Sequence, residues 1–301
     1  MAERSAIEWT DATVNFWWGC TKVGPGCDHC YAETWNNFRG NKLWGPGAPR
    51  RPIKGSMAML RKLQNTAAAF EQEHGRPRRV FMQSMSDTFD NEVDDVWRTH
   101  VFAGIEAAPA IRVQLLTKRI GNVEKMVPET WRSGSWPRHV GLMITVVTQK
   151  EANRDIPKLV ELKKRLGIPW VGLSIEPMLE PMDVSKWAKD LDWIIVGGES
   201  GRSARPIREE WVDEIHRQCV RSGTAFFFKQ WGEWLPEDEA PFEVFADLRR
   251  RRAERRELHQ DPNPFAVCRP DTRTVYRAGK KASGALLNGQ TYREFPKELC
   301  A

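Results

Sequence analysis

Three cysteines near the N-terminus are the residues of this chain best suited to chemistry. Cys20, Cys27 and Cys30 share one loop, and the Gly-Pro-Gly run at 24–26 gives that loop a tight turn. Thiolates are the soft ligands that iron–sulfur clusters and zinc prefer. Three thiolates are an odd number for disulfides and one too few for a closed zinc site, whereas a cubane cluster held by three keeps one iron open. The loop therefore predicts a cubane iron–sulfur cluster.

Two other interpretations of the loop stay open. The cysteines could be ordinary buried side chains, or they could hold zinc. Zinc sites usually combine two Cys-x2-Cys or Cys/His units, and only Cys27 and Cys30 form such a unit here. A zinc ion would need a fourth ligand from His29, Cys219, Cys268 or Cys300.

The composition indicates a globular protein without a membrane segment. The 301 residues are 41% hydrophobic and 29% charged, with a mean hydropathy of -0.57. No apolar run approaches the ~20 residues of a membrane span, and the start does not read as a signal peptide. Six cysteines, three of them clustered, fit a reducing compartment. We expect a cytoplasmic monomer, and the net charge of +6 permits a nucleic-acid partner without requiring one.

Apolar, β-rich segments alternate with segments of helical period along most of the chain. This alternation predicts an α/β protein with a parallel sheet, either an incomplete (β/α) barrel of about six or seven strands or an open doubly wound sheet. The helical segments are Ser56–Glu73, Asn91–Ala108, Lys150–Leu166 and Arg208–Arg221. The expected strands are Val14–Trp18, Val80–Met85, Ile111–Leu116, Val140–Val147, Pro169–Ile175, Trp193–Val196 and Ala225–Phe228.

The domain boundary is expected near the end of the last strand. Residues 1–228 are predicted to form the partial barrel, with the cluster loop at 20–30. Proline and charge density rise in residues 229–301, a stretch too short for a core of its own. We therefore predict that it caps the barrel mouth. Lys280 and Lys281 would then either reach into the pocket or stay on the surface.

Polar residues follow the expected strands at their carboxyl ends. These ends share one edge of a parallel barrel, so their side chains are predicted to line one pocket with the cysteine loop. A helix cap is the alternative for any one of them. The pocket residues singled out are Ser86, Asp87, Gln149, Glu176, Gly197, Gly198 and Glu199.

The Cys-x6-Cys-x2-Cys loop and the repeated βα pattern resemble the radical S-adenosylmethionine superfamily. In more detail the chain is similar to a phage- and prophage-associated branch of unknown function. The resemblance spans residues 9–296 and departs from most of the superfamily in one respect, since six residues rather than three separate the first two cysteines. The matching blocks lie at 17–23, 26–33, 84–87, 115–119, 174–178, 196–201 and 227–232, with a final block at 279–282 and 286–289.

This resemblance implies a cofactor pair and a reaction type. Cys20, Cys27 and Cys30 would hold a [4Fe–4S] cluster, and S-adenosylmethionine would chelate the fourth iron. Reductive cleavage of the sulfonium releases a 5′-deoxyadenosyl radical that abstracts a substrate hydrogen. The electron would come from a reductant such as a flavodoxin or ferredoxin.

The resemblance also implies roles for the pocket residues. His29 and the turn at 197–199 would lie near the adenine, and Asp87 or Ser86 would bind the methionine amino group. Gln149 and Glu176 would contact the ribose or the methionine. The longer spacing of the first two cysteines makes the path of the loop, and with it these contacts, harder to transfer.

Three features hint at a nucleic-acid substrate. Residues 248–258 carry six arginines, Arg76, Arg78 and Arg79 form a second cluster, and Trp231 and Trp234 could stack on a base. Solvated helix faces and core tryptophans are the alternatives. Two functions remain open, namely a radical enzyme that modifies or repairs a substrate such as a nucleobase in DNA or RNA, and a non-catalytic iron–sulfur or zinc protein that binds nucleic acid.

Overall fold

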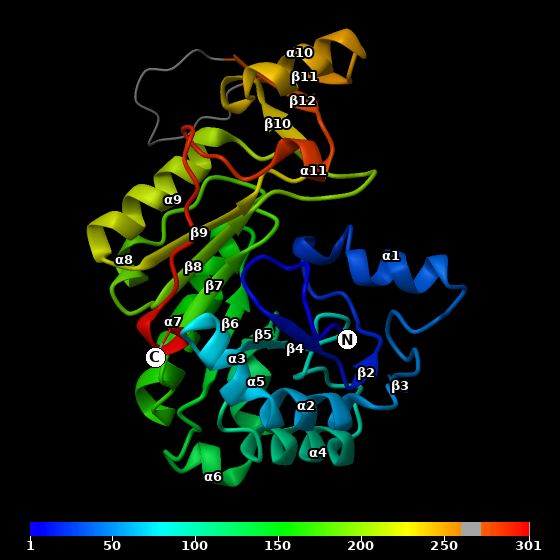
Figure 1. Ribbon diagram of the computed structural model, residues 1–301, viewed down its shortest axis with the longest axis vertical. Helices are drawn as coiled ribbons and strands as arrows, with labels where there is room; N and C mark the ends of the chain where they lie inside the picture. Colours follow the sequence, from blue (N-terminus) through cyan, green and yellow to red (C-terminus); the bar gives the residue numbers. More distant parts are fainter. Residues whose placement is uncertain (260–271, 301) are drawn as a thin grey trace.

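The chain folds around one parallel sheet that curls into a half-barrel. In the computed structural model, which describes residues 1–259 and 272–300, seven strands lie in the order β1-β4-β5-β6-β7-β8-β9 and curl through 199° (Figure 1). This confirms the predicted incomplete barrel. The strands are β1 Ala12–Val14, β4 Arg79–Met82, β5 Arg112–Thr117, β6 Val140–Thr145, β7 Val171–Ile175, β8 Trp193–Gly197 and β9 Ala225–Gln230.

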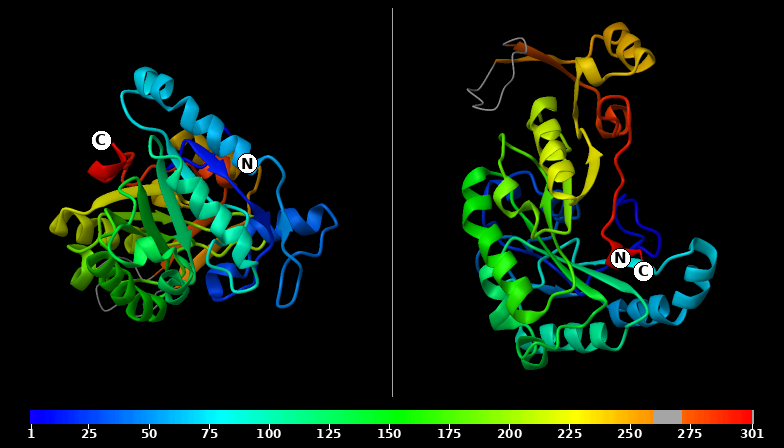
Figure 2. Two further views of the ribbon diagram at one scale, coloured as in Figure 1. Left: turned by 90° about the horizontal axis from the view of Figure 1, so that it is seen from below. Right: turned by 90° about the vertical axis from the view of Figure 1, so that its left-hand side faces the viewer.

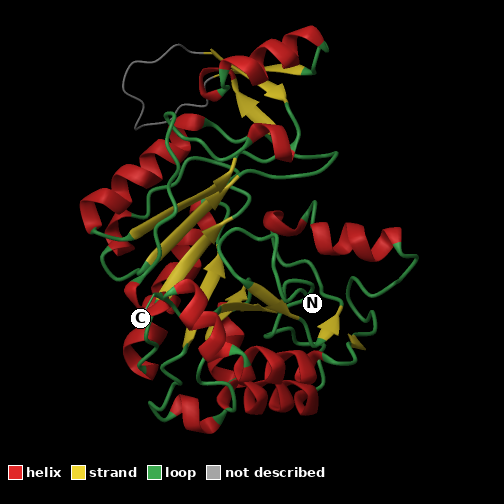
Figure 3. Ribbon diagram, in the orientation of Figure 1, coloured by secondary structure: helices red, strands yellow, loops and turns green. Residues whose placement is uncertain are grey.

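The helices cover the convex face of the sheet (Figure 3). Alternate strand side chains such as Val80, Leu142 and Val196 pack against helix residues such as Leu159 and Ile215 in one large core. Because both faces of a parallel strand are buried, these strands read as continuous apolar runs. The helices on this face are α2 Ser56–Asn65, α3 Ala67–His74, α4 Asp95–Glu106, α5 Ile120–Met126, α6 Glu129–Arg132, α7 Gln149–Leu166, α8 Ser185–Ala188 and α9 Glu209–Ser222.

Aromatic side chains fill the concave face at the amino ends of the strands. Trp9, Phe81, Trp170, Trp193 and Phe227 form a second buried cluster there. The indole of Trp170 crosses β6 at position 141, where a Cβ would lie 1.8 Å from the ring, so only glycine fits. This packing closes the amino end of the half-barrel and leaves space only towards the carboxyl ends of the strands.

The first expected strand, Val14–Trp18, is wrong in detail. β1 ends at Val14, and β2 Trp17–Trp18 is a separate strand that pairs antiparallel with β3 Arg51–Pro52. Asn15 makes the turn because its side-chain oxygen accepts a hydrogen bond from Met85 N at 2.8 Å. The first barrel strand therefore does not run directly into Cys20.

The helix predicted over Ser56–Glu73 is two helices, α2 and α3. They meet at Thr66, whose hydroxyl donates to Lys62 O at 2.8 Å and accepts from Arg78 Nη1 at 2.8 Å. A β-branched residue that bonds back to the preceding turn bends a helix. The apolar period continues across the bend, so the sequence does not reveal it.

The C-terminal extension has three parts that lie in different places. A small antiparallel sheet, β10 Trp234–Pro236, β12 Thr272–Arg277 and β11 Arg255–His259, carries α10 Phe242–Arg250 and stands beyond the carboxyl end of β9 (Figure 2). The short helix α11 Lys280–Ser283 follows. Residues 290–299 then return along β9, where Phe228 N donates to Tyr292 O at 3.1 Å.

A buried carboxylate ties two parts of this extension together and makes the stability of the protein pH-dependent. Both carboxylate oxygens of Glu239 accept from Asn288 N, and burial, reinforced by Glu209 and Asp213, raises the pKa of Glu239 from 4.5 to about 7. The folded state thus binds a proton more tightly than the unfolded state. The contribution of Glu239 to the free energy of unfolding is fully present below about pH 4.5 and is lost as the pH rises through about 7.

We expect Glu239→Gln to remove this pH dependence. The amide keeps a neutral acceptor for Asn288 N and cannot ionise. In urea unfolding the variant should gain about 1–3 kcal/mol over the native protein at about pH 8 and nothing near pH 4.5. Parallel stability profiles for the two proteins would show that Glu239 does not carry the effect.

Candidate active site at the strand ends

A cavity of about 490 Å³ opens at the carboxyl ends of β4 to β9. It is lined by the cysteine loop, by residues that follow these strands, and by Lys280 of α11. The structure therefore brings most of the predicted pocket residues to one place. Those lining the cavity are Cys20, Cys27, His29, Cys30, Ser86, Asp87, Glu176, Gly198 and Glu199.

Gln149 and Gly197 are not among the lining residues. The side chain of Gln149 accepts from Asp183 N at 2.6 Å and donates to Asp183 O at 3.0 Å, which ties the start of α7 to a neighbouring loop. A Cβ on Gly197 would lie 3.1 Å from Glu176 Oε1, and one on Gly198 would lie 1.9 Å from Trp231 O. The two glycines thus allow the end of β8 to approach the segments that follow β7 and β9. The side chain of Gln149 does not line the cavity.

Two glycines seat the cysteine loop on the end of the sheet. A Cβ at Gly26 would lie 2.9 Å from the Val147 side chain, and one at Gly24 would lie 2.5 Å from Glu151 Oε1. Cys30 directly precedes α1 Tyr31–Phe38. The loop therefore packs closely over the carboxyl end of β6, and larger residues would lift it away.

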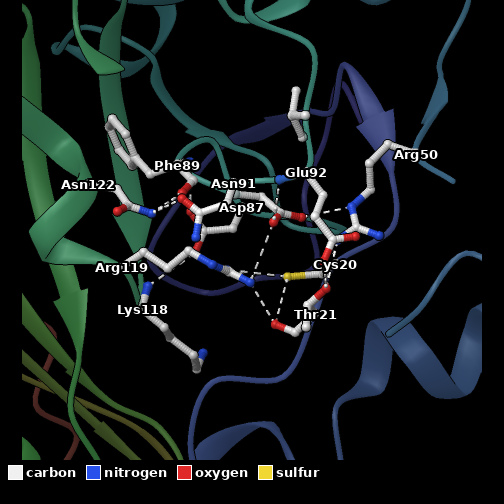
Figure 4. A network of polar contacts seen from close by, with 12 residues as sticks. Cys20, Thr21, Arg50, Asp87, Phe89, Asn91, Glu92, Lys118, Arg119 and Asn122 are labelled. Atoms are coloured by element: carbon white, nitrogen blue, oxygen red, sulfur yellow. Dashed lines mark hydrogen bonds and ion pairs between the residues drawn. The ribbon is translucent and has the colours of Figure 1, made fainter. Parts of the chain in front are cut away.

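Arg119 connects the loop to the barrel (Figure 4). Its guanidinium is 3.5 Å from Cys20 Sγ, donates to Thr21 O at 2.6 Å and pairs with Asp87 at 3.0 Å. A second buried arginine, Arg50, bonds Thr21 Oγ1 at 2.7 Å. Burial is the largest single influence and would lower the pKa of Arg119, but Asp87, Cys20 and Asp90 together outweigh it and raise that pKa.

Asp87 has little capacity left for a ligand. Its carboxylate accepts from Phe89 N at 2.9 Å, Thr117 Oγ1 at 2.8 Å, Lys118 N at 3.2 Å and Arg119 Nη1 at 3.0 Å. These donors occupy most of its acceptor positions. In this structure Asp87 holds Arg119 in place, and the amino-group contact that the resemblance implies for Asp87 or Ser86 stays a prediction.

The three thiols share the cavity without forming a closed metal site. Burial, reinforced by Asp87, raises the pKa of Cys20 to about 12, and the Arg119 guanidinium opposes this rise. Cys20, Cys27 and Cys30 are all unpaired by disulfides. Within the part of the chain that the structure describes, no group of three His, Cys, Asp or Glu side chains is arranged to hold one metal ion.

Arg205 ties the cysteine loop to the end of β8. It pairs with Glu199 at 2.7 Å and with Asp28 at 3.1 Å, and it donates to Pro25 O at 3.0 Å. Glu199 also faces His29 Nδ1 at 3.0 Å. Burial alone would raise the pKa of Glu199, but the hydrogen bonds from Arg205 and His29 lower it. Residue 205 lies in a loop with no sequence signal that would have revealed it.

Two of the remaining cysteines, Cys219 and Cys300, do not line the cavity. Cys219 is buried in the large core, and Cys300 is exposed. Cys268 lies outside the described residues. No cysteine of the described ranges other than those of the loop therefore lines the cavity.

A family model described as a protein of unknown function (DUF5131) matches residues 4–296. The chain belongs to this family. None of the curated proteins matches it. Among solved structures, a cysteine-to-serine variant of spore photoproduct lyase is 12% identical, with a TM-score of 0.45 over 76% of this chain and 79% of that chain. A variant with bound AdoMet and dinucleoside spore photoproduct is 14% identical, with a TM-score of 0.38 over 88% and 68%. A likeness at this level assigns no activity.

The cavity of this DUF5131 protein carries polar groups suited to a ligand. Glu176 pairs with Lys229 at 2.7 Å and accepts from Ser174 Oγ at 3.1 Å. Four lining residues hold a buried polar atom without a hydrogen-bond partner, namely Trp9 Nε1, Gln83 Nε2, Ser86 Oγ and Gln230 Oε1. Buried polar atoms usually find partners, so such atoms at a cavity wall indicate a missing ligand or water.

Positive charge exceeds negative charge around the cavity. Asp87, Glu176 and Glu199 are its carboxylates, and each of them is already paired with a cation. The cations lining it are Lys22, Lys118, Arg119, Lys229 and Lys280. Arg119 lies two residues after β5, and Lys229 lies one residue before the end of β9. The position at a strand end that selected Asp87 could therefore have selected them too.

The predicted base-stacking tryptophans are core residues. Trp231 and Trp234 are buried, and their indole N–H groups donate to Leu286 O at 2.7 Å and Ala204 O at 2.8 Å. Neither can stack on a base. Their position near the last strand end is correct, but the extension covers them.

The two arginine clusters are largely neutralised. Arg76 pairs with Asp11 at 2.6 Å, and Arg78 and Arg79 are buried. In the run on α10 and β11, ion pairs hold four arginines to three acids, and none of the six lines the cavity. The pairs are Arg250 and Arg251 with Asp247, Arg255 with Glu257, and Arg256 with Glu254.

None of the helices in the described ranges combines the length and apolarity needed to cross a membrane.

Proposed function

We propose that this protein is a radical S-adenosylmethionine-type iron–sulfur enzyme. The observation that carries the proposal is the placement of three unpaired cysteines from one loop on a cavity at the carboxyl ends of a half-barrel. The donor set fits the group, because an iron–sulfur cluster takes thiolate ligands and the excess of lysine and arginine offsets their negative charge. Cys20, Cys27 and Cys30 would hold a [4Fe–4S] cluster.

The other cavity residues would bind and orient S-adenosylmethionine. When bound, the cluster supplies the electron that cleaves the sulfonium and starts radical chemistry. The hydroxyl of Ser86, which has no hydrogen-bond partner, could bind the amino-acid part of S-adenosylmethionine. Glu176 and Lys229 offer one charge of each sign, which suits the ammonium and the carboxylate of that part. His29 and Glu199 lie on the other side of the loop, at the end of β8. The aromatic cluster at the amino ends of the strands excludes water from that end of the half-barrel.

The reaction needs an electron donor and a substrate from outside this chain. A flavodoxin or ferredoxin would supply the electron, and we propose a nucleobase in DNA or RNA as the substrate to be modified or repaired.

Anaerobic reconstitution with iron and sulfide tests the cofactor assignment. The protein should take up about four irons, absorb broadly in the visible, and form 5′-deoxyadenosine when S-adenosylmethionine and dithionite are added. A colourless protein that instead binds one zinc per chain would overturn the proposal and support a non-catalytic zinc protein.

A further inference from the structure

The helix that follows the cysteine loop exposes three aromatic side chains to solvent. Tyr31, Trp35 and Phe38 of α1 are 60%, 42% and 81% exposed. Their spacing places them on one face, while Ala32 and Asn36 on the opposite face are buried. Three adjacent exposed aromatic rings are unusual on a monomer surface and indicate an interaction site.

Acidic residues are scarce around α1, and Glu33, the one acid within the helix, pairs with Lys22 at 2.9 Å. No Asp or Glu occurs between Glu33 and Glu71, a stretch that contains seven lysines and arginines. Among these, Arg39, Lys42 and Arg51 are exposed, and the described residues contain no ion pair to any of them. The Arg39 guanidinium lies 4.6 Å from the Trp35 ring centroid. The surface thus combines aromatic planes with uncompensated positive charge.

This surface adjoins the cavity. α1 begins directly after Cys30, Tyr31 itself lines the cavity, and its hydroxyl donates to Ser84 O on the opposite wall. Figure 1 shows α1 projecting from the body at the side of the half-barrel where the chain begins. A polymer held on α1 would therefore pass the entrance of the site.

We infer that Tyr31, Trp35 and Phe38, with Arg39, Lys42 and Arg51, form a binding surface for single-stranded DNA or RNA; we call it the α1 surface. Exposed rings can stack on successive bases, and the cations meet the phosphates between them. An acidic protein partner would match the charge but has no need of stacked planar rings. The step in which the strand delivers one nucleotide to the cavity rests on the proposed function, whereas strand binding does not.

The test measures fluorescence anisotropy of labelled single-stranded DNA and RNA with native protein and variants. Trp35→Ala/Phe38→Ala should weaken binding at least about thirtyfold, because each stacked base contributes about fivefold or more and the variant removes two stacking rings. Arg39→Gln/Lys42→Gln/Arg51→Gln should lower the slope of log affinity against log salt by about two, since three phosphate contacts are lost. All these side chains are exposed, so thermal unfolding should stay unchanged.

Phe242→Ala/Arg250→Gln is the matched control. Phe242 is 84% exposed and lies with Arg250 on α10, so this variant removes an equally exposed ring and a cation from the arginine run. It should bind like the native protein. If the control loses affinity and the α1 variants do not, the run on α10 is the binding site and the inference is wrong.

Two further outcomes would also overturn it. One is the absence of oligonucleotide binding at low salt. The other is native oligonucleotide affinity in the α1 variants together with slower reduction of their cluster by a flavodoxin. That second result would assign the α1 surface to the electron donor. Because binding is measured on protein without iron as well as reconstituted protein, failure of S-adenosylmethionine cleavage in the native protein would refute the proposed function and leave the binding result standing.

Discussion

Replacing Cys20, Cys27 or Cys30 singly by serine is expected to abolish cluster assembly. Serine matches cysteine in shape, but its hydroxyl stays protonated and is a poor ligand for iron. All three thiols come from one loop, and no other cysteine of the described residues reaches the cavity to substitute for a lost ligand. Visible absorption, iron content and 5′-deoxyadenosine formation should therefore fall to background in each variant.

Cys300→Ser is the control for this experiment, since Cys300 is exposed and lies outside the cavity. It should retain native iron content. Circular dichroism of the iron-free proteins should be the same for all four variants, because the loop is fixed by Gly24, Gly26 and Arg205 and not by the thiols. Native iron content in any one loop variant would show that this cysteine is not a ligand, and the three-thiolate site would have to be abandoned.

The sheet could be predicted because its strands and helices leave patterns in short stretches of sequence. A parallel strand covered on both faces must be apolar throughout, and the helix that follows must show a 3.6-residue period. The first strand was misplaced because Phe16, Trp17 and Trp18 continue the apolar run while Asn15 turns the chain. The hydrogen bond that makes this turn comes from Met85, seventy residues away, which no local pattern reports.

The location of the site could be predicted from the sequence, but the role of each side chain in it could not. Strand ends converge in any parallel barrel, so Ser86, Asp87 and Glu176 were expected together. Which of them is free for a ligand depends on donors from neighbouring strands. Four donors converge on Asp87, whereas the hydroxyl of Ser86 has none. The same holds for the tryptophans, because burial under a C-terminal extension is decided by tertiary packing.

The pairing of Asp87 with Arg119 predicts a large loss of stability in Asp87→Ala. Both residues are buried, and removing the carboxylate leaves the guanidinium with only Asp90, at 3.7 Å, as a charged partner. Breaking one side of a buried pair costs about 3–5 kcal/mol, which should appear as a lower urea midpoint of the iron-free protein. Without Asp87 to hold its guanidinium, Arg119 would also no longer fix Cys20 and Thr21, so iron uptake should fall as well.

Two comparison variants separate this role from ligand binding. Asp87→Ala/Arg119→Met removes both charges and should recover part of the lost stability, because no buried cation is left without its partner. Ser86→Ala, one residue away, should leave the urea midpoint within about 1 kcal/mol of native, since its hydroxyl makes no hydrogen bond, and should weaken S-adenosylmethionine binding in calorimetry. A native urea midpoint for Asp87→Ala with a loss of S-adenosylmethionine affinity alone would restore Asp87 as the ligand-binding carboxylate and make the Arg119 pair incidental.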